Sequence, residues 1–206
     1  MGLYRDFILP RGIAWGMSGK DISAERPRCI GRARGRVVEV GFGAGLNLPH
    51  YGEGVEELFA VEPARLNRKL AQRRIDEATF PVTWVGLEGE SIPLEDDSAD
   101  CVVSTWTLCT IPDLPQALSE MKRVLKPEGS LLFLEHGLSP DDKVARWQHR
   151  LNGFQKWWAG GCHLNRKIDA LVTQAGFAID ELEASYMKGP KPVSYLYCGV
   201  ARPASS

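Results

Sequence analysis

The chain has 206 residues, 44% of them hydrophobic, and a formal net charge of −1 at pH 7. The length favours one large domain with an ordinary hydrophobic core over two domains. The charge offers no basic field for a nucleic-acid backbone, so nucleic-acid partners are excluded. Five cysteines without CxxC spacing, no signal-peptide pattern and no apolar run of about 18 residues predict a reduced cytoplasmic protein that does not span a membrane. The composition predicts no particular oligomeric state.

Residues 1–34 are basic and interrupted by glycines and prolines, which predicts an irregular N-terminal extension. From Gly35 onward, short apolar strands alternate with helical segments. The expected strands are 36–40, 57–62, 82–85, 100–104, 130–135, 177–183 and 194–201. The expected helices are a short one after Gly45 that ends near Pro49, then 64–77, 114–125, 143–158 and 166–174, the last with Asn165 as its cap. The alternation predicts an α/β, Rossmann-like sheet of about seven mostly parallel strands, with helices on both faces and an antiparallel addition at one edge.

The segment Val37-Val38-Glu39-Val40-Gly41-Phe42-Gly43-Ala44-Gly45 places three glycines at alternate positions directly after a β-branched run. Glycines at such a turn let the backbone pass close to a ligand, and a following helix directs its N–H groups at it. The third glycine of the dinucleotide fingerprint would fall at position 46, which is Leu46. This offset favours a nucleoside cofactor other than NAD, although a plain tight turn would use the same residues.

Glu62 ends the second expected strand and lies 21 residues after Gly41. A carboxylate at a spacing of about 20 residues accepts hydrogen bonds from ribose hydroxyls in nucleotide-binding folds. The other interpretation is a solvated carboxylate at a strand end. A loop around Gly89 and Glu90 can offer backbone groups to an adenine edge, or it can be an acidic surface turn.

Five segments resemble, in order, the motifs of class I S-adenosylmethionine-dependent methyltransferases: residues 39–45, Glu62-Pro63, 89–93, 97–103 and 120–129. The resemblance covers residues 35–137 and implies S-adenosylmethionine as the methyl donor and S-adenosylhomocysteine as the product. It implies that Gly41, Gly43 and Gly45 hold the methionine portion, Glu62 the ribose and Gly89-Glu90 the adenine. The other residues expected to bind the donor are Glu39, Asn47, Pro63, Ser104 and Thr105.

A narrower resemblance concerns the acceptor side. Residues 104–111, 133–136 and 160–166 are similar to the animal thiol S-methyltransferases of the methyltransferase-like group and to their bacterial relatives. This implies methyl transfer to a small hydrophobic acceptor, with a thiol as the leading candidate. The residues expected around the acceptor are Trp106, Cys109, Cys162 and His163. The whole chain, 1–206, is then expected to be one methyltransferase domain, with 1–34 as a lid or extension, 35–137 as the cofactor-binding core and 138–206 as acceptor-side helices and C-terminal strands.

Glu135 and His136 end the fifth expected strand. Histidine titrates near neutrality, so His136 is predicted to be the general base. Glu135 is predicted to be a catalytic partner that orients another group, because adjacent strand residues face opposite ways; a hydrogen-bonded structural pair is the alternative. Cys109 is a nucleophile only if its thiol pKa is lowered, and is otherwise a small buried hydrophobe. Cys162 and His163 are adjacent and have no second pair, so no metal site is predicted.

Trp147, Leu151, Phe154 and Trp158 recur at helical spacing, which predicts a stripe that faces the core. Basic neighbours leave open a lid or a lipid-facing role. They also support a second enzymatic hypothesis, methylation of a lipid, quinone or amine head group by a protein peripheral to a membrane. Two other hypotheses are a non-catalytic nucleoside-binding module and an NAD-dependent oxidoreductase, and Leu46 argues against the oxidoreductase.

Overall fold

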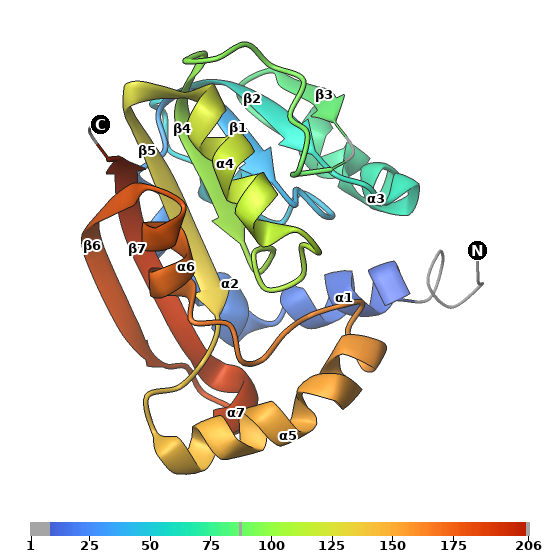
Figure 1. Ribbon diagram of the computed structural model, residues 1–206. Coiled ribbons are helices and arrows are strands. Elements are labelled where there is room, and N and C mark those ends of the chain that lie inside the picture. Colours follow the sequence, from blue (N-terminus) through green and yellow to red (C-terminus); the bar gives the residue numbers. More distant parts are fainter. Residues whose placement is uncertain (1–8, 87, 205–206) are drawn as a thin grey trace.

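The central sheet has seven strands in the part of the chain that the computed structural model describes, residues 9–86 and 88–204. Their order is β3-β2-β1-β4-β5-β7-β6 (Figure 1). Strands β1 to β5 pair in parallel, whereas β7 runs antiparallel to both β5 and β6. The strands are β1 (Gly35–Val40), β2 (Val55–Val61), β3 (Val82–Gly86), β4 (Ala99–Thr105), β5 (Leu125–His136), β6 (Phe177–Tyr186) and β7 (Tyr195–Pro203). The seven predicted strands are confirmed, and the antiparallel strand lies one position in from the edge strand β6.

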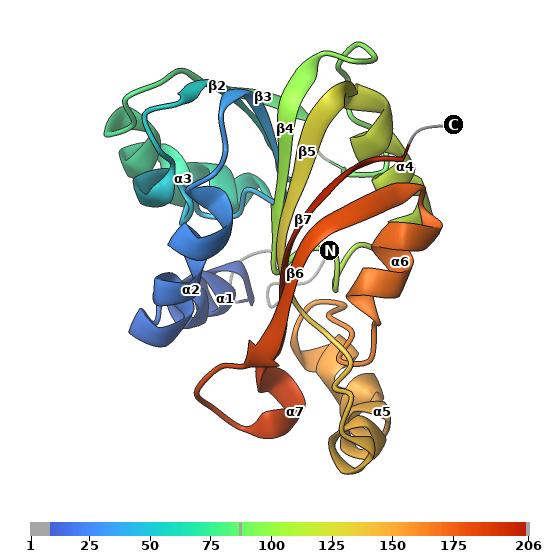
Figure 2. The ribbon, with the colours of Figure 1, turned by 90° about the vertical axis from the view of Figure 1, so that its left-hand side faces the viewer.

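Helices cover both faces of the sheet, as predicted (Figure 2). Helices α2 and α3 pack on one face, and α4 and α6 pack on the other. Helices α1 and α5 lie beyond the carboxyl ends of β4 and β5 (Figure 1). The helices are α1 (Leu9–Met17), α2 (Lys20–Ile30), the 3-10 helix η2 (Leu48–His50), α3 (Arg65–Asp76), α4 (Leu114–Val124), α5 (Asp142–Trp158), α6 (Ile168–Gln174) and α7 (Lys191–Ser194).

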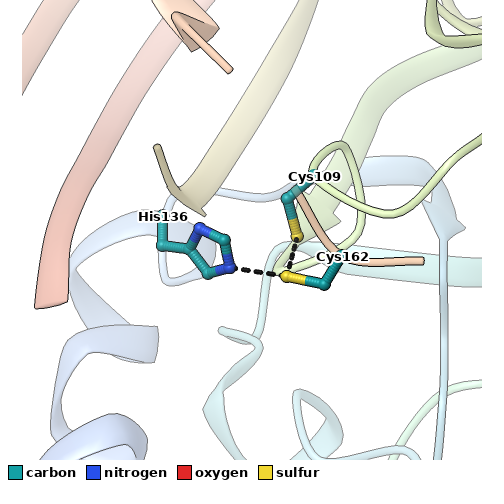
Figure 3. A group of neighbouring side chains, drawn as sticks. All are labelled: Cys109, His136 and Cys162. Carbon is teal, nitrogen blue, oxygen red and sulfur yellow. Dashed lines mark hydrogen bonds between the residues drawn. The ribbon is translucent and has the colours of Figure 1, made fainter. Parts of the chain in front are cut away.

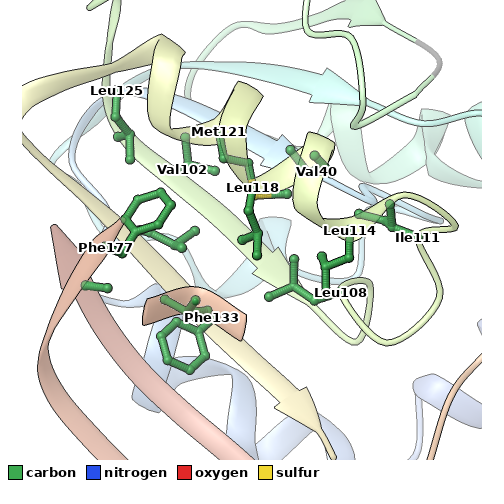
Figure 4. Packing of buried hydrophobic residues seen from close by; sticks show 14 of the residues in the cluster. Val40, Val102, Leu108, Ile111, Leu114, Leu118, Met121, Leu125, Phe133 and Phe177 are labelled. Atoms are coloured by element: carbon green, nitrogen blue, oxygen red, sulfur yellow. The ribbon is translucent and has the colours of Figure 1, made fainter. Parts of the chain in front are cut away.

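Two buried apolar clusters enclose the sheet between them. Successive residues of β1 point to opposite faces, so Val37 belongs to one cluster and Val38 to the other. On the second face, Leu118 and Met121 of α4 pack with Phe133 of β5 (Figure 4). Strands buried on both faces have continuous apolar runs, and these runs made the central strands recognisable in the sequence.

The N-terminal segment is helical where the sequence predicts irregular structure. The described residues 9–30 form α1 and α2, and Pro27 lies in the last turn of α2. The helix tolerates this proline because Cys29 and Ile30 are buried, and their burial outweighs the poor local propensity. The prediction is therefore wrong for these residues, while residues 1–8 lie outside the described part of the chain.

Two predicted helix starts also differ. The predicted short helix after Gly45 is present as the 3-10 helix η2, which begins three residues later at Leu48 and includes Pro49. Helix α6 begins at Ile168, and Asn165 does not cap it. The Asn165 amide lies 3.0 Å from His149 Nδ1 of α5 instead. Asn165 therefore makes a tertiary contact with α5 in place of the helix cap that the local sequence predicts.

Helix α5 turns its aromatic residues to solvent, so the predicted core-facing stripe is wrong. Trp147, Phe154 and Trp158 are 54%, 62% and 56% exposed. The buried side chains of this helix are Val144 and Gln148, which are four residues apart on another face. A large apolar surface therefore lies open beyond the carboxyl edge of the sheet. Across residues 9–86 and 88–204, the helices lack the combination of length and apolarity that crossing a membrane requires.

Gly199 of β7 provides a test of the packing. It pairs with Phe133 of β5, and a Cβ at position 199 would collide with the Phe133 ring. We expect Gly199→Ala to lower the free energy of unfolding by about 1–3 kcal/mol, because a packed core absorbs an extra methyl group only by shifting. In the matched control, Gly153→Ala in α5, the added Cβ has no other atom within 4 Å. The control should raise stability by about 0.5–1 kcal/mol. Urea denaturation followed by circular dichroism measures both, and an unchanged midpoint for Gly199→Ala would contradict the packing.

Candidate active site

The candidate site lies at the carboxyl edge of the sheet, where β1 and β4 are neighbours. From β1 the chain continues to β2 on one side, whereas β4 leads to β5 on the other side. Loops diverge at such a switch point, and open α/β sheets bind their ligands there. The residues predicted to bind the methyl donor lie at or after the carboxyl ends of β1, β2, β3 and β4. The predicted acceptor residues follow β4 and α5, and the predicted catalytic residues Glu135 and His136 end β5.

The glycine loop after β1 adopts a backbone that requires its glycines. Gly41, Gly43 and Gly45 have φ angles of 80°, 57° and 71°, in the left-handed region that other residues rarely adopt. A Cβ at position 41 would collide with the Thr107 side chain, and one at position 45 would come within 3.2 Å of Leu48. At position 43 the nearest heavy atom is the Gly41 carbonyl oxygen, 3.9 Å away. The loop therefore leaves room for a ligand to approach the main chain at Gly43.

Glu62 ties this glycine loop to the start of α3. Its Oε2 accepts a hydrogen bond from the Gly43 N–H at 2.7 Å. Its Oε1 accepts from the Ala64 N–H at 2.8 Å and from Asn67 Nδ2 at 3.0 Å. A carboxylate has about four lone-pair positions, so one remains for a ribose hydroxyl. Pro63 is exposed and begins the turn into the helix.

A buried polar network joins three of the predicted donor residues behind the loop. Asn47 Nδ2 donates to Glu39 Oε1 at 2.8 Å and to Thr105 Oγ1 at 3.0 Å. The Tyr51 hydroxyl donates to Glu39 Oε2 at 2.6 Å. Burial raises the pKa of Glu39 to about 7, against the opposing effects of the Tyr51 hydrogen bond and the charge of Arg26. A cation bound nearby would favour the charged form of this carboxylate.

Arg26 of α2 is a site residue that the sequence does not single out. It is 4% exposed, and its guanidinium donates to Asn47 Oδ1 and Thr105 Oγ1. The same group lies 4.7 Å from the centre of the Trp106 ring. Burial lowers the pKa of Arg26 to about 10, and the charge of Glu39 offsets part of this effect. Asn47 lies between the two opposite charges, because it accepts from Arg26 and donates to Glu39. The N-terminal segment contains no motif, so only the packing of α2 reveals this residue.

The segment predicted to bind adenine lies against the end of β1. A Cβ on Gly89 would come within 2.8 Å of Val40 Cγ1, so a larger residue fits there only if its surroundings move. The Oε1 atom of Glu90 accepts a hydrogen bond from the Asp113 N–H, at the start of α4, over 3.4 Å. Gly89 and Glu90 thus lie beside the strand that leads into the glycine loop, and their contact with adenine stays a prediction.

The loop after β4 is held by the buried carboxylate of Glu135. Its Oε1 accepts hydrogen bonds from Ser104 Oγ at 3.0 Å and from the backbone N–H groups of Thr107 and Leu108 at 2.9 and 3.0 Å. Burial raises the pKa of Glu135 to about 8, and the charge of Cys109 adds to the rise. In this position Glu135 shapes the loop, and Ser104 is one of the groups that donate a hydrogen bond to it. A direct catalytic role for the carboxylate stays a prediction.

Trp106 introduces local strain into the same loop. Its φ angle is 51°, a left-handed conformation that is rare for a bulky side chain. Its backbone N–H donates to the Leu134 carbonyl of β5 at 2.8 Å. Such strain persists only where the surroundings fix it, and it is concentrated at functional sites.

The thiol–imidazole cluster (Cys109, His136 and Cys162) brings together three of the predicted residues (Figure 3). His136 Nε2 lies 2.8 Å from Cys162 Sγ, and the Cys162 thiol donates to Cys109 Sγ over 3.6 Å. Both cysteines are buried. His163 donates its backbone N–H to the Cys109 carbonyl at 2.8 Å, but its ring lies outside the cluster.

Within the cluster, the three side chains shift one another's pKa values. The hydrogen bond from Cys162 holds the pKa of Cys109 well below its ordinary value; burial opposes this effect, and the charge of His136 supports it. Burial lowers the pKa of His136, but the charge and hydrogen bond of Cys109 raise it above its ordinary value overall. The hydrogen bond to Cys109, together with burial, raises the pKa of Cys162 far above its ordinary value. Cys109 is buried, as a small hydrophobe would be, but its Sγ also contacts the polar groups of Cys162 and Thr110.

Comparison with known proteins identifies the family of the chain. A family model described as a methyltransferase domain matches residues 38–133. The thiol S-methyltransferase TMT1B of Rattus norvegicus is 33% identical over 171 residues, which cover 79% of this chain and 66% of that protein. The TMT1B protein of Homo sapiens is 30% identical over 181 residues, which cover 81% of this chain and 69% of that protein.

A solved structure shows the same fold. The YcgJ protein of Bacillus subtilis superposes with a TM-score of 0.66 at 16% identity, covering 90% of this chain and 99% of that one. The chain spans about two thirds of the length of the two TMT1B proteins. From the matched domain and these relatives, the chain belongs to the class I S-adenosylmethionine-dependent methyltransferase family.

Proposed function

We propose that this protein transfers the methyl group of S-adenosylmethionine to a small hydrophobic thiol. One observation carries the proposal: a single loop after β4 reaches the donor residues at Thr105 and the thiol–imidazole cluster at Cys109. Membership of the family supports the donor and the reaction. The names of the thiol S-methyltransferase relatives support the acceptor.

The donor residues suit a zwitterionic nucleoside. Arg26 and Glu39 offer opposite charges to the methionine carboxylate and ammonium, and Glu62 keeps one lone-pair position for the ribose. The donor supplies a methyl group that is already activated on a sulfonium. These side chains therefore have only to hold and align it, and positioning of this kind can lower a barrier by about 7–11 kcal/mol.

The acceptor side must handle a proton, because the nucleophile is the thiolate and not the thiol. The sequence predicts that His136 takes this proton directly. The two loops predicted around the acceptor contact each other, since Arg166 donates to the carbonyls of Leu108 and Ile111. Glu135 holds the same loop after β4 by accepting the backbone N–H groups of Thr107 and Leu108.

A second candidate function is methylation of a lipid, quinone or amine head group at a membrane surface. Helix α5 exposes Trp147, Phe154 and Trp157, the last by 70%. Between residues 143 and 158 the charged side chains are all basic: Lys143, Arg146, Arg150 and Lys156. Trp15 of α1 is 82% exposed, and helix α1 lies at the same end of the molecule as α5 (Figure 1). A basic helix with an aromatic face lies in the interface of an anionic bilayer.

Arg26→Gln provides a test of the donor site. The variant should bind S-adenosylhomocysteine about 10–100-fold more weakly, because a charged hydrogen bond contributes about 1.5–3 kcal/mol. It should bind 5′-methylthioadenosine as wild type does, because that nucleoside lacks the amino-acid group. Isothermal calorimetry measures both affinities. The control is Arg28→Gln on the same helix, which removes a surface ion pair with Glu183 and should change neither. An equal loss for both nucleosides would assign Arg26 a structural role.

An acceptor screen provides a test of the reaction. Release of S-adenosylhomocysteine should follow the addition of alkyl thiols, and amines or phenols of the same size should give little or none. Release with lipid head groups alone would support the second candidate. Donor binding without release from any acceptor would indicate a non-catalytic nucleoside-binding module, and binding of neither sulfur nucleoside would contradict both functions.

Removal of two α5 aromatics provides a test of membrane contact. The double variant Phe154→Ala/Trp157→Ala should partition into phosphatidylcholine–phosphatidylserine vesicles about tenfold more weakly than wild type, because less apolar area enters the interface. Leu182→Ala in β6, at an apolar side chain that is 43% exposed, is the control and should partition normally. Co-sedimentation measures the bound fraction. Wild-type protein that stays in the supernatant at low salt would exclude this candidate.

A further inference from the structure

The thiol–imidazole cluster has the composition of a soft metal site. Cys109 comes from the loop after β4, His136 from the end of β5 and Cys162 from the segment after α5 (Figure 3). Their ligand atoms all lie within 4.8 Å of one another. Two thiols and an imidazole select zinc or copper(I), whereas magnesium and calcium require oxygen ligands.

The distances suit a tetrahedral ion. With zinc–sulfur bonds of about 2.3 Å, two thiolates on one ion lie about 3.8 Å apart. The two Sγ atoms are 3.6 Å apart here. His136 Nε2 and Cys162 Sγ are 2.8 Å apart, which is a hydrogen-bond distance. A bound zinc ion would widen this separation to about 3.5 Å, a change that side-chain torsions can supply.

The surroundings hold the two cysteine ligands in place. The Cys109 carbonyl accepts the His163 N–H, and Gln155 Nε2 points at Cys162 Sγ over 3.9 Å. Beyond Cys162, the Leu164 N–H donates to Asn152 Oδ1 at 2.9 Å. Outer contacts of this kind orient the ligands of known zinc sites. Two thiolates also cancel the charge of Zn²⁺, which suits a buried position.

We propose that Cys109, His136 and Cys162 bind one zinc ion and leave its fourth coordination position open to the acceptor thiol. The role of the ion rests on the proposed thiol methylation, whereas its binding does not. On coordination the acceptor thiol releases its proton to solvent and stays bound as a thiolate. Its sulfur then forms a bond to the donor methyl carbon while the bond from that carbon to the sulfonium sulfur breaks. The products are a thioether and S-adenosylhomocysteine.

This assignment replaces two expectations from the sequence. His136 acts as a ligand, so its Nε2 lone pair is not available for the predicted role of general base. The absence of a metal site was inferred from Cys162 and His163 alone. The structure instead combines Cys162 with Cys109 and His136, which lie 53 and 26 residues away in the sequence.

Metal content provides a test of the site without any acceptor. Wild-type protein grown with zinc and purified under reducing conditions should contain close to one zinc ion per chain by plasma mass spectrometry. After the zinc is removed, cobalt(II) should give thiolate-to-cobalt charge-transfer absorption and strong visible bands typical of a tetrahedral site. Cys109→Ser and His136→Ala should each weaken zinc binding at least about 100-fold in competition with a chromophoric chelator. The matched control, Cys198→Ser in β7, should keep its zinc.

Binding of S-adenosylhomocysteine shows whether each variant is folded, so a loss of zinc is not mistaken for unfolding. An alkyl thiol added to the cobalt protein should shift the charge-transfer band. Wild-type protein that binds the nucleoside but neither zinc nor cobalt overturns the proposal. So do zinc retained by Cys109→Ser, copper(I) as the only metal bound, and a Cys109–Cys162 disulfide under reducing conditions. Zinc binding without thiol methylation would instead overturn the proposed function and leave the metal site in place.

Discussion

Glu135 has no exposed surface, and three hydrogen bonds converge on one of its carboxylate oxygens. Two of the donors are consecutive backbone N–H groups, at Thr107 and Leu108, and each would cost about 1–3 kcal/mol if buried without a partner. Because one oxygen holds both groups, the chain turns sharply where β4 ends. That turn places Trp106 in its left-handed conformation and brings Cys109 to the thiol–imidazole cluster. The raised pKa of Glu135, about 8, is the consequence of burying this carboxylate to hold the loop.

The sequence predicts the strands well, but it predicts poorly how the helices α2 and α5 pack around the sheet. The central strands are buried on both faces, so their apolar runs are local signals that need no knowledge of the fold. Helix α5 lacks such a signal, because spacing shows which residues share a face and not what that face meets. Trp147 and Phe154 have the periodicity of a core helix, but no second layer covers them. Helix α2 is missed for the opposite reason, since burial of Ile30 stabilises a helix whose local sequence contains Pro27.

The residues of the candidate site also separate into those that the sequence predicts and those that it does not. Glu39 and Glu62 could be predicted because each belongs to or directly follows a parallel strand, and such strands end at one edge of the sheet. Arg26 could not be predicted, because its place depends on where an N-terminal helix without a motif packs. The thiol–imidazole cluster is an intermediate case. A family resemblance identified its residues one by one, but their meeting requires the segment after α5 to fold back onto the loop after β4, which no local pattern encodes.

The loop after β4 joins the residues predicted to bind the methyl donor to those predicted around the acceptor. Its first residues are held by Asn47 and by the contact between Arg26 and the Trp106 ring, its middle by Glu135, and its far end by Arg166. Methyl transfer depends on the distance and alignment between the methyl carbon and the attacking atom, so misplacement by about 1 Å can cost about 100-fold in rate. A loop fixed at three points sets that distance through one short piece of backbone.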